Sequence, residues 1–89
     1  MATYKFSLIT PDGQIFSDEI ASLTVPGTEG QFGVLANHAP LVALTKEGTL
    51  SLRQNNSQMF YTIGPGVLEV NSSHDVLLLC DSAISQESK

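Results

Sequence analysis

The chain has 89 residues, with four basic and nine acidic side chains and a net charge of −5, so it has room for one small domain with a single core. Its hydrophobic fraction of 42% is too high for a disordered chain. The few basic residues are scattered, so they offer no concentrated positive surface, and we expect no nucleic-acid partner.

Apolar runs in the sequence are short, and none has the length of a signal peptide core or a membrane span. We therefore expect a soluble, intracellular chain that does not insert directly into lipid. The single cysteine, Cys80, cannot form an intramolecular disulfide, so no disulfide is predicted and a reducing compartment fits. Because Cys80 ends the apolar run 76–80, we expect a buried, structural thiol.

The first quarter of the chain predicts two strands. Residues 3–10 alternate apolar and polar side chains, and Pro11-Asp12-Gly13 predicts a turn. A second strand is predicted over residues 14–25, with an interruption near Ser17-Asp18.

A glycine-punctuated segment follows, in which Gly27, Gly30 and Gly33 stand three residues apart. A dinucleotide-binding motif would need a helix after its glycines, and a phosphate-binding P-loop would need Lys followed by Ser or Thr. Here Val34-Leu35 follows, and Pro40 comes soon after. We interpret the segment as a displayed loop that contains a short strand, with Phe32, Val34 and Leu35 at its apolar tip.

The rest of the chain also predicts strands, separated by polar or glycine-containing turns. These strands are expected over residues 41–44, 49–53, 58–63, 67–70 and 76–80. No stretch predicts a helix of ten residues. The fold class is therefore all-β, a flattened sandwich or barrel, with the domain over residues 1–84 and a frayed polar tail over residues 85–89.

Strand alternation separates an inner from an outer set of side chains in residues 49–63. Tyr61 and Ile63 fall on one side, whereas Phe60 and Thr62 fall on the other, as does the polar Thr49 on its own strand. We expect Phe60 to be an exposed interface anchor. The alternative is that the register slips and Phe60 belongs to the core.

Catalytic and metal-binding constellations are not evident. His38 and His74 lack companions at ligand or general-base spacing, and Asp18-Glu19 is not part of a calcium loop. We expect no catalytic residues, no metal, no cofactor and no enzyme activity. The exposed apolar side chains favour a binding module instead.

Several separated motifs resemble one family, the N-terminal β-domain of the epsilon subunit of F-type ATP synthase (delta in mitochondria). The resemblance covers residues 3–84 in order. The motifs are the segment 25–35, His38-Ala39-Pro40-Leu41, Lys46-Glu47-Gly48, the segment 64–70 and the closing segment 80–84.

This resemblance implies a flattened sandwich of about ten short strands and a non-catalytic rotor subunit at the foot of the central stalk. One sheet face would pack on the gamma subunit, and the glycine segment would rest on the polar loops of the c-ring. The subunit would couple ring rotation to ATP synthesis. It would be a peripheral protein on the cytoplasmic side of an energy-transducing membrane.

The resemblance also implies site residues. The c-ring-facing set is Glu29, Gln31, Phe32, Gly33, Val34 and His38, and the gamma-facing set is Val42, Thr49, Phe60 and Thr62, with Val42 expected on a strand next to Phe60. If Gly33 has a positive φ, a β-branched residue there would strain the backbone.

Three departures from the family pattern stand out. Gln31 replaces a common acidic residue, and Ala36-Asn37 replaces a common Pro-Gly. The family usually continues into a two-helix C-terminal domain, whereas this sequence stops at Lys89, which fits either a naturally short subunit or a truncated one. In both cases we expect the inhibitory and ATP-sensing functions to be absent from these residues. An unrelated β-sandwich adaptor or small-ligand module is the alternative to a coupling subunit.

Overall fold

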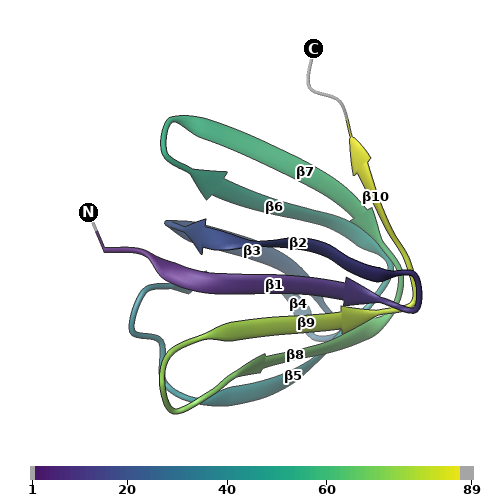
Figure 1. The fold of residues 1–89 in the computed structure, drawn as a ribbon. Coiled ribbons are helices and arrows are strands. Elements are labelled where there is room, and N and C mark those ends of the chain that lie inside the picture. The colour runs from purple at the N-terminus through teal and green to yellow at the C-terminus, as the bar shows by residue number, and fades with distance from the viewer. Residues whose placement is uncertain (1, 87–89) are drawn as a thin grey trace.

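The computed structural model describes residues 2–86, which form ten β-strands (Figure 1). No helix occurs among these residues. The strands are β1 Tyr4–Thr10, β2 Gly13–Ile20, β3 Ser22–Gly27, β4 Gly30–Leu35, β5 Leu41–Thr45, β6 Gly48–Gln54, β7 Ser57–Ile63, β8 Gly66–Val70, β9 Val76–Cys80 and β10 Ala83–Gln86.

One continuous sheet connects the strands in the order β10-β7-β6-β3-β5-β8-β9-β1-β2, with β4 added on β3. The pairs are antiparallel except β1 with β9. Strand β3 pairs with β6 through residues 22–24 but meets β5 only at Gly27. The sheet therefore folds over at β3 and forms two layers, with β6 and β7 above and β5, β8 and β9 below in Figure 1.

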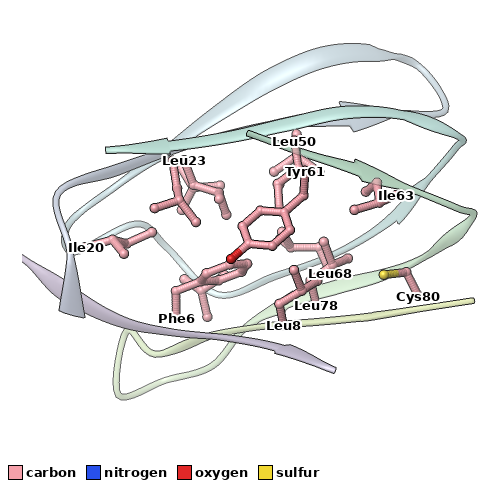
Figure 2. Close-up of a cluster of buried hydrophobic side chains, with 14 of the residues drawn as sticks. Phe6, Leu8, Ile20, Leu23, Leu50, Tyr61, Ile63, Leu68, Leu78 and Cys80 are labelled. Atoms are coloured by element: carbon pink, nitrogen blue, oxygen red, sulfur yellow. The ribbon is translucent and has the colours of Figure 1, made fainter. Parts of the chain in front are cut away.

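The core lies between these layers. Leu50, Tyr61 and Ile63 extend from β6 and β7 toward Leu8, Leu68 and Leu78 of the other layer (Figure 2). All six are at most 4% exposed. Because side chains alternate along a strand, the remaining side chains of both layers point outward, in opposite directions.

Aromatic contacts close the sheet on itself. The ring of Phe16 on β2 lies 6.0 Å from that of Phe6 and 6.5 Å from that of Tyr61 on β7. The side-chain amide of Gln54 donates to the carbonyl oxygen of Glu19 at 3.0 Å. Strand β2, at one end of the sheet path, is therefore tied to β7 and β6 near the other end, which gives the barrel-like closure.

Most predicted strands are confirmed, with two corrections. The interruption expected at Ser17-Asp18 is at Ala21, whose N–H bonds to Arg53 because the chain there leaves β1 and joins β6. Ser85 and Gln86, expected in the tail, pair in β10 with Tyr61 and Phe60. The rest of the predicted tail, residues 87–89, lies outside the described residues.

Candidate functional site

The glycine segment forms a β-hairpin, and the expectation of a displayed loop with a short strand is therefore wrong. Strands β3 and β4 pair from Ser22–Leu35 to Gly27–Gly30, which leaves Thr28-Glu29 as a two-residue connection. Gly30 has a φ of +124° and supplies the turn conformation. Gly33 is not among the positive-φ glycines of the described residues, so the strain considered for it does not arise.

The predicted c-ring-facing residues are spread along this hairpin and do not share one tip. Glu29 lies in the turn and His38 follows the far end of β4, six residues and about 20 Å along. Gln31 and Gly33 are exposed on β4, as is Leu35.

Two members of that predicted set are less accessible than expected. Val34 is fully buried, so its placement at an exposed tip is wrong; it belongs to the core, and its carbonyl oxygen accepts a 2.6 Å bond from the Tyr4 hydroxyl. Phe32 is half-buried and packs against the core. The reason is that β4 alternates, which turns both side chains inward.

Local hydrogen bonds fix the connection that carries His38. The imidazole of His38 bonds through Nδ1 to the Ala39 carbonyl oxygen at 2.7 Å. The Nδ1 of His74 bonds to the carbonyl oxygen of His38 at 3.1 Å, reaching across from the β8–β9 turn. Asn37 has a φ of 64°, a conformation that asparagine tolerates better than most residues, so it can stand where the family commonly has glycine.

The predicted gamma-facing residues lie on two different faces. Thr49 pairs with Thr62, and Ser51 pairs with Phe60, on the outer side of β6 and β7. Phe60 is half-buried and outside the core cluster, so the alternative that places it in the core is wrong. Val42 lies on β5, which pairs with β8 and β3. Its expected position beside Phe60 is therefore also wrong.

The most apolar surface is the outer side of β5, β8, β9 and β1. Four side chains there are well exposed: Val42 69%, Leu44 60%, Leu79 47% and Val67 38%. The sheet register aligns Leu44, Val67, Leu79 and Ile9 in one row across the four strands. Together with Leu77 and Val42 in the next row, these residues form what we call the apolar face. Such a contiguous patch is typical of an interaction surface.

Two hollows adjoin the apolar face. One, of about 340 Å³, lies between the β3–β4 turn and β5 and is lined by Phe32, Val42 and Leu44, among others. The other, of about 440 Å³, is lined by Ile9, Val67 and Leu79 together with residues of the neighbouring turns. The row of apolar side chains therefore runs between two depressions that can receive protruding side chains of a partner.

Three titratable side chains, those of Tyr4, Tyr61 and Cys80, are buried in the core. Burial raises the pKa of the Cys80 thiol, which donates to the Ser82 carbonyl oxygen at 3.3 Å. Burial also raises the pKa of the Tyr4 and Tyr61 hydroxyls. Among residues 2–86 no cluster of three His, Cys, Asp or Glu side chains could hold a metal ion. Nor does this part of the chain contain a helix long and apolar enough to cross a membrane.

Two apolar runs in the sequence indicate the apolar face. Residues 41–44 and 76–80 are continuous apolar runs, without the polar alternation of β6. A strand that is apolar on both sides needs cover on both sides. In a domain with a single core, the second side of such a strand lies on the surface, where it is available to a partner.

A comparison with known families decides what kind of domain this is. The family model for the β-sandwich domain of the ATP synthase delta/epsilon chain matches residues 3–86. The chain belongs to this family. The match covers all ten strands, and it confirms the resemblance that the separated motifs indicated.

Curated members of the epsilon-chain family are similar over nearly the whole sequence. The ATP synthase epsilon chain of Rhodopseudomonas palustris (strain BisA53) is 42% identical over 85 residues, covering 96% of this chain and 62% of the relative. That of Campylobacter curvus (strain 525.92) is 38% identical, covering 94% of this chain and 65% of the relative. The chain thus spans less than two thirds of the length of these epsilon chains.

Chains of two solved ATP synthase assemblies have the same fold. A chain of the Euglena gracilis mitochondrial ATP synthase, in an assembly of OSCP, F1 and c-ring, superposes with a TM-score of 0.89 at 26% identity, over 96% of this chain and 54% of that one. A chain of the Tetrahymena thermophila mitochondrial ATP synthase central stalk and c-ring gives 0.80 at 12% identity, over 93% and 66%. The second likeness supports the fold alone.

Proposed function

We propose that this chain is a non-catalytic rotor subunit of a proton-translocating ATP synthase. It joins the gamma subunit of the central stalk to the c-ring, and it couples ring rotation to ATP synthesis. The subunit is held at the cytoplasmic side of an energy-transducing membrane by these partners. Membership in the delta/epsilon family supports this assignment.

The apolar face is the observation that carries the proposal. It offers four exposed aliphatic side chains on adjacent strands and two flanking hollows. We assign this face to the gamma subunit, so that Val42 keeps its expected role. Thr49, Phe60 and Thr62 lie on the opposite outer face and form a second candidate contact, with Phe60 as the large apolar member.

The c-ring contact is assigned to the hairpin side of the molecule. Glu29, Gln31 and His38 present polar groups along the open edge of β4, which pairs with β3 only. Polar side chains suit contact with the polar loops of a ring. Gln31 can hydrogen-bond there but has no charge, so it cannot form the salt bridge that an acidic residue would allow.

Binding to purified gamma subunit tests the gamma assignment. Leu79→Ser removes an outward-facing side chain that is 47% exposed, so we expect the fold to be retained and gamma affinity to fall by about 1–3 kcal/mol. Leu35→Ser is the matched control, because Leu35 is 66% exposed on β4, outside both candidate gamma contacts. Isothermal titration calorimetry measures both variants.

The assignment of the apolar face to the gamma subunit would be overturned if variants of the other face lost more gamma affinity than Leu79→Ser. If Ile84→Ser or Phe60→Ala weakens gamma binding and Leu79→Ser does not, the gamma subunit occupies the Phe60 side. If neither the wild-type chain nor any variant binds gamma, the coupling function itself is refuted, and an adaptor or small-ligand module becomes the better description.

A further inference from the structure

One carboxylate interrupts the apolar face. Glu69 is exposed on β8, where the register places it between Val42 of β5 and Leu77 of β9. Val67 precedes it on the same side of the same strand. Glu69 therefore has apolar neighbours on three sides, and the fourth side leads to the β8–β9 turn.

No lysine or arginine of the described residues lies directly beside Glu69 in the sheet register, where its neighbours are Val42 and Leu77. The three basic residues of the described part are Lys5, Lys46 and Arg53. Lys5 is on β1, two strands across and two residues along from Glu69, about 12 Å of sheet away, and it pairs with Glu19. Lys46 follows the end of β5, and Arg53 is on β6 of the other layer.

This arrangement constrains the surface that can cover the face. An apolar partner would remove water from the Glu69 carboxylate without replacing its hydrogen bonds, which is strongly unfavourable. A partner that brings a lysine or arginine opposite Glu69 keeps the burial of the aliphatic side chains and satisfies the charge. Arginine fits best, because its planar guanidinium can donate two parallel hydrogen bonds to one carboxylate.

We propose that Glu69 is the specificity-determining residue of the apolar face, and that it accepts an ion pair from a lysine or arginine on the stalk partner. This inference rests on the proposed function, because it names the chemistry of the partner surface at the same face. The apolar face should bind a partner surface that is apolar and carries one cationic side chain. A uniformly apolar or an acidic surface is rejected.

The test is a titration of the wild-type chain, Glu69→Gln and Glu69→Lys with purified gamma subunit, at low and high salt. We expect Glu69→Gln to weaken binding by about tenfold or more, and Glu69→Lys to weaken it further. The affinity of the wild type should fall with salt more steeply than that of Glu69→Gln, since one charge pair is lost. Glu47→Gln, in the exposed β5–β6 turn, is the control with the same charge change. Thermal melts confirm folding of each variant.

Equal or tighter binding by Glu69→Gln would overturn the inference, because the carboxylate would then act only as a charge that keeps an apolar face from self-association. A loss of affinity in Glu47→Gln as large as in Glu69→Gln would overturn it too, since net charge would explain both. Leu79→Ser separates this failure from that of the proposed function. If Leu79→Ser weakens binding and Glu69→Gln does not, the ion pair is refuted while the gamma assignment stands.

Discussion

At the residue scale, two buried threonines differ in whether their hydroxyl group has a hydrogen-bond partner. Thr45 is 3% exposed, and its Oγ1 has no hydrogen-bond partner in the described part of the chain, whereas the Thr10 Oγ1 accepts from the Asp12 N–H at 3.1 Å. We expect Thr45→Val to raise the free energy of unfolding by about 1 kcal/mol and Thr10→Val to lower it by about 1 kcal/mol. Urea denaturation of both variants checks this. Equal destabilisation would show that Thr45 is satisfied.

The buried hydroxyl of Tyr4 makes the stability of the fold depend on pH in the alkaline range. Its hydroxyl is buried and its pKa is raised by desolvation above the value of about 10 in an unfolded chain. Above pH 10 the unfolded state therefore releases a proton that the native state keeps, and the free energy of unfolding falls as pH rises. Tyr4→Phe should be less stable at pH 7, because it loses the bond to Val34, and should lose less stability between pH 9 and 11. Denaturation across that pH range measures the difference in slope.

At the scale of the elements, glycines differ sharply in what they tolerate. A Cβ at Gly66 would collide with the Leu79 carbonyl oxygen on β9 and lie 2.8 Å from the Cys80 Cα, whereas a Cβ at Gly33 would meet only the Leu23 carbonyl oxygen at 3.7 Å. We expect Gly66→Ala to destabilise the domain by about 2–3 kcal/mol through separation of β8 from β9. Gly33→Ala should be neutral or slightly stabilising. Equal melting temperatures for the two variants would contradict this.

The same elements show how far local pattern predicts structure. Alternation along β1, β6 and β7 was sufficient to place Leu50, Tyr61 and Phe60 on their correct sides, because those strands have one polar face. It failed for β4. The residues Gly30-Gln31-Phe32-Gly33 do not alternate in hydrophobicity, and the pairing with β3 that turns Val34 inward is a tertiary property.

At the scale of the whole molecule, the sequence did not predict which strands pair with one another in the sheet. Val42 and Phe60 were expected side by side, but the sheet passes through β3 between β5 and β6, which puts them on opposite faces. The apolar face arises from the register of four strands drawn from residues 4–80. Such a surface is non-local, so the apolar runs at 41–44 and 76–80 indicated that a partner is needed without showing where.

The hairpin side of the whole molecule carries the last prediction. His38→Ala should change the free energy of unfolding by less than about 0.5 kcal/mol. The imidazole is only half-buried and bonds to the neighbouring carbonyl, and the His38 carbonyl that accepts from His74 remains in the variant.

If the hairpin side meets the c-ring, the same change should lower ATP synthesis driven by proton flow, in membranes containing the complete complex, relative to ATP hydrolysis. His74→Ala is the comparison, because it releases the connection that carries His38 without removing the His38 ring. It should loosen residues 36–40 and reduce coupling less than His38→Ala if His38 itself makes the contact. A steep fall in the melting temperature of His38→Ala would instead identify His38 as a structural residue, and unchanged coupling in both variants would remove this side from the ring interface.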